Sequence, residues 1–162
     1  MTVERTTHDA GSGDDIVVFL IGMRVNKPWR PDAWWPVAAA MPRMLRELSQ
    51  DPDSGLLGYR MAISKDGPVV IQYWRDVESL YGYASDPDKE HRPAWTAFFR
   101  RAHKVPGAVG IWHETYHVAA SESVYGDMPT LGLAAAVGRV PVGRGTDRAR
   151  QRLASGKLGA RR

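Results

Sequence analysis

The sequence predicts one α+β domain in which helices cover one face of an antiparallel sheet. The length of 162 residues is typical of a single domain with short extensions. Apolar residues make up 43% of the chain, which is enough for a hydrophobic core and argues against wholesale disorder. Local patterns place strands and helices in the order β-α-β-β-α-β.

The first strand is expected over residues 16–25, which are rich in β-branched and aromatic side chains and too apolar to face water. A helix is expected over residues 31–49, because apolar side chains recur there every three or four positions. Pro42 lies in its interior and predicts a kink. The residues at helical spacing are Trp34, Val37, Met41, Leu45 and Leu48.

A β-hairpin is the clearest local feature of the sequence. Residues 56–64 and 69–75 are predicted strands, and Asp66-Gly67 is a dipeptide typical of the tight turn between two such strands. Asp76 follows the second of them, where its carboxylate can cap a new helix.

The second helix is expected to pause at residues 85–88 and to resume through residues 91–99, and residues 109–118 form the fourth strand. This order of elements is the ferredoxin-like, or split βαβ, arrangement. Its helices cover only one face of the sheet. Because apolar and aromatic residues occur on both faces, we expect the uncovered face to pack against a second copy in a homodimer.

Both ends differ in composition from the part between them. Residues 1–14 are polar and contain glycines, so they are expected to form a flexible leader before a folded domain over residues 15–137. Residues 138–162 are expected to form a basic, disordered tail, and positions 139–162 hold eight Lys/Arg and a single Asp. Because the tail lacks aromatic side chains and an apolar helical face, nucleic acid is not an expected partner.

Several classes of protein are excluded by what the sequence lacks. Without cysteine, the chain has no disulfide, thiolate metal site or cysteine nucleophile. The longest apolar run, residues 16–22, is far shorter than the roughly 20 residues of a membrane helix, and no secretory signal is found. A cytoplasmic protein without a membrane partner is therefore expected. The motifs of Rossmann, P-loop, zincin and serine-hydrolase sites are absent, and no metal site is expected.

Alternation along the first and fourth strands indicates a site on the uncovered face of the sheet. Arg24 and Asn26 end one row of the first strand, and His113 and His117 share one row of the fourth. If these rows lie on the same face, His113 is the candidate proton acceptor and Arg24 stabilises the resulting anion. The opposite facing of the fourth strand would place Glu114 in the site instead. For Arg24, an ion pair with a surface carboxylate is an equally good explanation.

The other candidates are residues that would position a small apolar substrate. The six tryptophans are many for this length, and most are expected in the core or in a dimer interface. Trp74, Trp112 and Thr115 join Asn26 and His117 as candidate substrate-binding residues. His91, at the start of an aromatic helix, is assigned a role only as a haem ligand.

Several segments, in the right order, resemble a known family. VVIQYWRDVESLYGYA, residues 69–84, is similar to the strand and helix of dimeric α/β-barrel proteins of the antibiotic-biosynthesis-monooxygenase type. More specifically, about residues 15–137 resemble the fumagillin-pathway monooxygenase-like family. The matching segments are FLIGMRVNKPWR (19–30), AMPRMLREL (40–48), GLLGYR (55–60), HRPAWTAFFR (91–100), GIWHETYHV (110–118) and YGDMPTLGL (125–133).

The resemblance implies a ferredoxin-like homodimer, a dimeric α/β barrel, that oxidises a small apolar natural-product-type substrate in a pocket between sheet and helices. Relatives of this barrel type divide between oxygenases that need no metal or prosthetic group and haem enzymes such as aldoxime dehydratases and chlorite dismutases. The leading expectation is a cofactor-independent monooxygenase with His113 as base. The alternatives are a haem enzyme, with His91 or His113 as axial ligand, and a non-catalytic dimer that binds a small apolar ligand.

Overall fold

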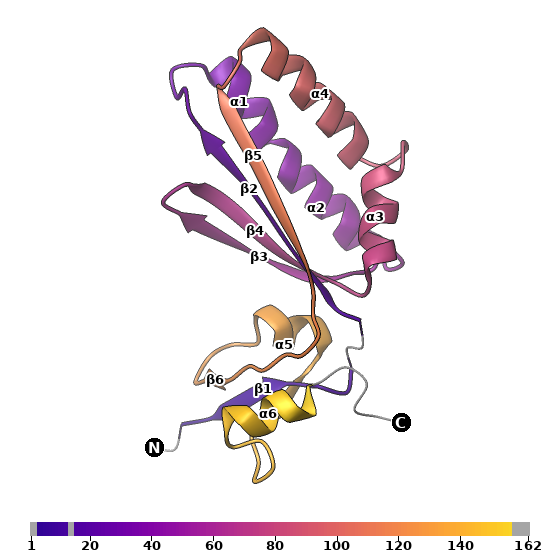
Figure 1. Cartoon of the computed structure of the whole chain (residues 1–162), viewed down its shortest axis with the longest axis vertical. Helices are drawn as coiled ribbons and strands as arrows, with labels where there is room; N and C mark the ends of the chain where they lie inside the picture. Colours follow the sequence, from indigo (N-terminus) through magenta and orange to yellow (C-terminus); the bar gives the residue numbers. More distant parts are fainter. Residues whose placement is uncertain (1–2, 13–14, 157–162) are drawn as a thin grey trace.

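The structure, a computed structural model, describes residues 3–12 and 15–156. A four-stranded antiparallel sheet carries helices on one face, and a smaller sheet lies beyond one end of it (Figure 1). The strand order of the large sheet is β3–β4–β2–β5, which confirms the predicted ferredoxin-like arrangement. Its strands are β2 (Val17–Val25), β3 (Leu56–Ser64), β4 (Gly67–Trp74) and β5 (Val109–His117).

The segment expected to form one kinked helix forms two helices, α1 (Pro31–Ala38) and α2 (Ala40–Gln50). The chain breaks at Ala39 and does not bend at Pro42. Pro42 has no N–H to bond the carbonyl of Ala38, and its ring would clash with that carbonyl in a continuous helix. Pro42 is tolerated in the first turn of α2, where backbone N–H groups lack partners within the helix.

The second helical segment divides as expected into α3 (Val77–Ser85) and α4 (His91–Lys104). Asp76 caps α3, because its carboxylate accepts a hydrogen bond from the backbone N–H of Ser79 at 2.7 Å. The side chain of Ser79 first and its backbone N–H second, together with Arg75 beside the carboxylate, hold the pKa of Asp76 below its usual range. No helix within residues 3–12 and 15–156 has the length and apolar character that a membrane span requires.

The main core lies between the sheet and helices α2 and α3. Val17, Leu48, Trp74 and Leu80 form one buried cluster, and the Trp74 side chain is wholly inaccessible. Its indole N–H donates to the side-chain oxygen of Gln72 at 2.9 Å, so burial leaves no polar atom of the indole unpaired. The expectation that Trp74 binds substrate is therefore wrong, because the ring is enclosed by the core.

Both ends of the chain depart from the expected leader and tail. A three-stranded sheet in the order β6–β1–β7 joins the start of the chain to its last third. We call this sheet and its two helices the terminal module. Figure 1 shows it beyond one end of the large sheet, with α5 near β3. The module consists of β1 (Arg5–His8), β6 (Tyr125–Gly126), β7 (Arg139–Pro141), α5 (Gly132–Val137) and α6 (Ala149–Ser155).

The flexible leader and disordered tail were expected because neither end has an apolar periodic pattern. Order comes instead from pairings distant in sequence, such as Thr6 with Pro141. The folded part accordingly extends beyond residues 15–137 in both directions. Residues 1–2, 13–14 and 157–162 of the expected leader and tail lie outside the described residues.

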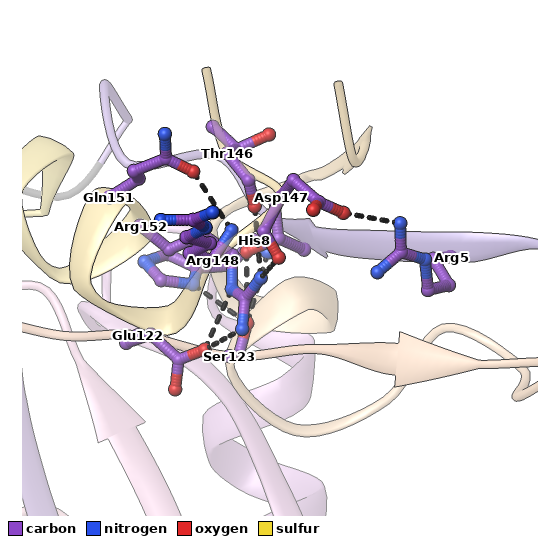
Figure 2. Close-up of polar contacts among 10 residues, drawn as sticks. Arg5, His8, Glu122, Ser123, Thr146, Asp147, Arg148, Gln151 and Arg152 are labelled. Carbon is purple, nitrogen blue, oxygen red and sulfur yellow. Dashed lines mark hydrogen bonds and ion pairs between the residues drawn. The ribbon is translucent and has the colours of Figure 1, made fainter. Parts of the chain in front are cut away.

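Polar contacts of buried side chains hold the terminal module together (Figure 2). Arg152 is only 6% exposed, and its guanidinium finds partners inside the module. Its Nε donates to Glu122 Oε1 at 2.7 Å, and its Nη1 donates to the carbonyls of Thr146 and Asp147, both at 2.9 Å. The ionic partner and the two carbonyls satisfy the guanidinium inside the module. A basic residue of the expected solvated tail is thus one of its structural residues.

His8 gives the terminal module a predicted pH dependence. The ring is buried, with Nδ1 2.8 Å from Ser123 Oγ and Nε2 3.0 Å from Ser121 Oγ. Burial lowers the pKa of His8 below its ordinary value of 6.5, although Glu122 and Asp9 oppose this shift. The folded state therefore binds this proton less readily than the unfolded state.

Stability from His8 should be fully present above about pH 6.5 and should decrease as the pH falls through the lowered pKa. We expect the free energy of unfolding, measured by urea denaturation from pH 7.5 to 5, to decrease less in His8→Gln than in the wild type. Glutamine keeps hydrogen-bonding capacity without titrating. An identical pH dependence of the two proteins would contradict the assignment.

Candidate functional site

A largely apolar cavity of about 460 Å³ lies between the helix-facing side of the sheet and helices α1, α2 and α4. Its floor includes Ile21 and Met23 of β2, Val70 of β4 and Ile111 of β5. Met23 pairs with Ile111 and Ile21 pairs with Val70, so these side chains share one face of the sheet. The cavity size falls within the range of small-molecule sites, about 300–1,000 Å³.

Methionine is the most distinctive component of the cavity wall. Four of the six methionines of the chain line it. The thioether side chain is flexible and polarisable, so a wall of this kind can adapt to ligands of irregular shape. The four residues come from β2, α2 and β3: Met23, Met41, Met44 and Met61.

Helix α4 forms the opposite wall, and the cavity separates it from the sheet. It carries apolar side chains at helical spacing, but none of its residues is fully buried. Ala94, Trp95 and Phe98 line the cavity, so their inner sides face the hollow and not a packed core. The helix places one titratable imidazole, that of His91, in the same row three residues before Ala94.

His91 has a fixed tautomer. Its Nδ1 lies 2.9 Å from the carbonyl oxygen of Ala84, and because a carbonyl only accepts hydrogen bonds, Nδ1 must carry the hydrogen. The lone pair is then on Nε2, where the imidazole can accept a proton or bind a metal. Trp95 stacks on the ring at a centroid distance of 6.3 Å and Tyr83 lies 6.1 Å away, so aromatic neighbours restrict its orientation.

Tyr83 is the other titratable group beside this imidazole. Its hydroxyl donates to Glu47 Oε2 at 2.9 Å. Burial first, and the Glu47 carboxylate second, raise the pKa of Tyr83 far above its ordinary value. The phenol therefore stays protonated and cannot serve as a base.

Arg24 and His113 lie on opposite faces of the sheet, which contradicts their predicted common site. In the β2–β5 register, Ile21 pairs with His113 and Arg24 pairs with Gly110. His113 therefore shares the helix-facing side with Ile21, and its ring contacts Phe19 at a centroid distance of 5.5 Å. Arg24, three positions from Ile21, points to the uncovered side and forms an exposed ion pair with Asp66 at 3.1 Å. The error arose because the alternation of side chains can be read within each strand, whereas the register between β2 and β5 depends on residues far apart in the sequence.

The uncovered face brings together Arg24, Asn26 and Trp112. A Cβ built on Gly110 would lie 3.9 Å from Arg24 Cβ and 3.8 Å from Asn26 Nδ2, which places both side chains on this side. The Trp112 indole lies across Gly22, whose missing Cβ makes room for the ring. Glu114, the stated alternative to His113, pairs with Leu20 on this face and accepts a hydrogen bond from the Tyr116 hydroxyl at 2.7 Å.

The other predicted site residues on β5 do not line the cavity. Thr115 pairs with Phe19 and His117 pairs with Val17, so both point to the helix-facing side, but β5 is an edge strand and both are exposed. His117 Nε2 lies 4.0 Å from Asp15. His91 is therefore the one predicted site residue that the described part of the structure places in the cavity wall.

Sequence reasoning missed the methionine-lined wall. The signal was present, because Met41 and Met44 are three residues apart on a predicted helix and Met23 belongs to the row of the first strand assigned to the helix-facing side. Those residues were interpreted only as core. Whether such a row packs tightly or borders a cavity depends on how far α4 stands from the sheet, which no local pattern encodes.

Comparison with solved structures supports the fold. An aldoxime dehydratase, OxdRE, solved in complex with butyraldoxime, matches with a TM-score of 0.56 and 16% identity over 71% of this chain and 34% of its own. The cofactor-independent oxygenase SnoaB from Streptomyces nogalater matches with a TM-score of 0.45 and 17% identity over 64% of this chain and 93% of its own. At these identities, the match to the dehydratase shows a shared fold and no more.

Comparison with sequences is more specific. No curated protein matches the chain significantly. A family model does match, over residues 16–133, which include the large sheet, the four helices beside it and the start of α5. The matched segment thus contains every residue named above in the cavity wall. The chain belongs to the monooxygenase af470-like family.

Proposed function

We propose that the protein oxidises a small apolar substrate with dioxygen inside the methionine-lined cavity, with His91 as the base and without a resident cofactor. The observation that carries this proposal is the His91 imidazole, which lines an apolar cavity with its Nδ1–H donated to Ala84 and its Nε2 left to accept a proton. Membership of a monooxygenase-like family supports the same reaction class.

The chemistry requires a substrate that becomes electron-rich on losing a proton, such as a phenol or a methylene between aromatic and carbonyl groups. His91 Nε2 takes that proton, and the resulting anion reduces dioxygen directly. For a methylene, two hydrogens are replaced by one oxygen atom, and the second oxygen atom leaves as water. The apolar wall excludes bulk water and fixes the substrate, so the protein supplies deprotonation, desolvation and orientation.

Dioxygen uptake by the purified protein tests this proposal. A panel of phenols, hydroquinones and anthrones should include compounds that are consumed with one dioxygen per molecule oxidised, at a rate proportional to protein concentration. The same rate should be observed after treatment with a metal chelator. Binding of panel members without any dioxygen uptake would contradict the oxidation and would support the alternative of a non-catalytic protein that binds a small apolar ligand.

Haem chemistry is a second candidate because the same histidine fits it. A neutral imidazole whose Nδ1–H is fixed by a backbone carbonyl is the usual form of an axial ligand, and His91 meets this requirement. Bound haem would supply redox chemistry at its iron, while the methionine and aromatic wall would hold an apolar substrate beside it. Protein produced with ample haem should then show a Soret band that His91→Gln shifts or removes. Protein that takes up no haem would eliminate this candidate.

We also propose that the uncovered face of the large sheet pairs with a second copy of the chain. Val18, Leu20 and Ile71 give this face an apolar centre, and Trp112 and Tyr116 are 38% and 52% exposed. An exposed apolar surface of this kind is typical of an interface. Sedimentation equilibrium should give twice the mass of one chain, whereas a monomer at micromolar concentration would contradict the pairing.

A further inference from the structure

Charged side chains are unevenly distributed along the cavity. Near the start of α4, Glu90 and Arg43 both line it and approach each other to 3.9 Å, so their charges offset one another. Near the end of α4, Arg100 and Arg101 line it. Within residues 3–12 and 15–156, no carboxylate forms an ion pair with either of these two arginines. One end of the apolar cavity therefore carries uncompensated positive charge.

The helix C-terminus alone does not explain this arrangement. Cations are favoured in the last turn of any helix, and α4 also has His103 and Lys104 there. Those two side chains are exposed and do not line the cavity. Arg100 and Arg101, in contrast, both line the cavity. Arg100 is exposed, whereas Arg101 is half-buried and continues the inward row that runs from His91 through Phe98.

We infer that the ligand of this cavity is an apolar molecule with an anionic group, a carboxylate or a group of similar charge, which Arg100 and Arg101 bind. This inference rests on the proposed function, which places the reacting end of the substrate at His91. It adds that the substrate carries an anionic group at its other end. Arg101 follows His91 by ten residues, a separation of about 15 Å along a helix. The anion is therefore bound far from the proton acceptor, and the two arginines are positioning and not catalytic residues.

The physical reason is the strength of charge-assisted hydrogen bonds beside an apolar surface. A guanidinium binds a carboxylate through paired N–H groups, and low local polarity strengthens the contact. The apolar body of the ligand meanwhile contacts thioether and aromatic groups. An uncharged ligand of the same shape retains the apolar contacts and loses the ionic ones.

A matched pair of probes tests the inference by isothermal titration calorimetry. We expect 2-naphthoate to bind about tenfold more tightly than the uncharged 2-naphthamide, and 2-naphthylmethylammonium to bind more weakly than both. The advantage of the acid should shrink when the salt concentration is raised. Equal affinity of acid and amide in the wild-type protein would overturn the inference.

Variants assign the effect to these side chains. In R100Q/R101Q the acid should bind no better than the amide, while binding of the amide itself should be unchanged. Arg101→Lys should retain part of the difference because it keeps the charge. Lys104→Gln is the control, because it removes a cation from the same helical turn outside the cavity wall; a loss as large as in the double variant would overturn the inference.

The result also separates this inference from the proposed function. Binding of acid and amide with equal affinity leaves the cavity as the site and rejects only the anionic substrate. Failure of both probes to bind at millimolar concentration contradicts the inference and the use of this cavity alike.

Discussion

Replacing His91 by glutamine should lower kcat for dioxygen-dependent oxidation by about 10²–10⁴-fold, the usual contribution of a positioned general base. Glutamine keeps a side-chain N–H that can reach the Ala84 carbonyl, so the start of α4 should keep its shape while the proton acceptor is lost. The expected change is therefore in kcat, with little change in the affinity for the substrate. Steady-state dioxygen uptake with the best compound of the panel measures it.

Two other histidine variants make this test specific. His103 is an exposed residue of the same helix and does not line the cavity, so His103→Gln should retain full activity. His113, the base expected from sequence, lies outside the cavity wall, so His113→Gln should also remain active. Loss of activity in His113→Gln together with full activity in His91→Gln would reverse the assignment.

Replacing Trp74 by alanine should reduce the free energy of unfolding by about 3–5 kcal/mol, because it opens a large cavity in the core. The indole is 0% exposed and packs against Val17, Leu48 and Leu80. Loss of the indole would also remove the N–H that donates to the side-chain oxygen of Gln72. Gln72 is only 4% exposed, so that oxygen would be left buried without a hydrogen-bond donor. Urea denaturation at neutral pH measures the change.

Trp29 provides the matched control for this prediction. Its side chain is 71% exposed, so Trp29→Ala should change the free energy of unfolding by no more than about 0.5 kcal/mol. If the two variants lose similar stability, Trp74 is not the centre of the core. If Trp74→Ala remains stable but loses ligand affinity, the substrate-binding role expected from sequence would be restored.

Local sequence patterns were sufficient to predict the fold of the central part of the chain. Strand alternation, the hairpin at Asp66-Gly67 and the cap at Asp76 each depend on residues close in sequence, and together they define the βαββαβ order. The terminal module has no such signal. Its strand β1 pairs with residues more than 110 positions away, and its buried His8 and Arg152 are polar residues that composition assigns to solvent.

The candidate site was predicted less well for a related reason. The face of each strand was assigned separately from its own alternation. Because Ile21 pairs with His113, His113 lies on the helix-facing side and not on the uncovered side with Arg24. The family resemblance, by contrast, implied a pocket between sheet and helices, which is where the cavity lies. His91 was considered only as a haem ligand, since nothing in the sequence shows that its Nδ1 meets the Ala84 carbonyl.

Methionine-methyl NMR tests most directly that ligands bind beneath α4 and not on the uncovered face. Four methionines, Met23, Met41, Met44 and Met61, line the cavity, whereas Met128 lies outside it and is 48% exposed. With ¹³C-methyl-labelled protein, 2-naphthoate should shift the four cavity resonances through its ring current and leave Met128 unchanged. Saturable binding that shifts the Trp112 indole resonance and none of the four methyl groups would contradict the account.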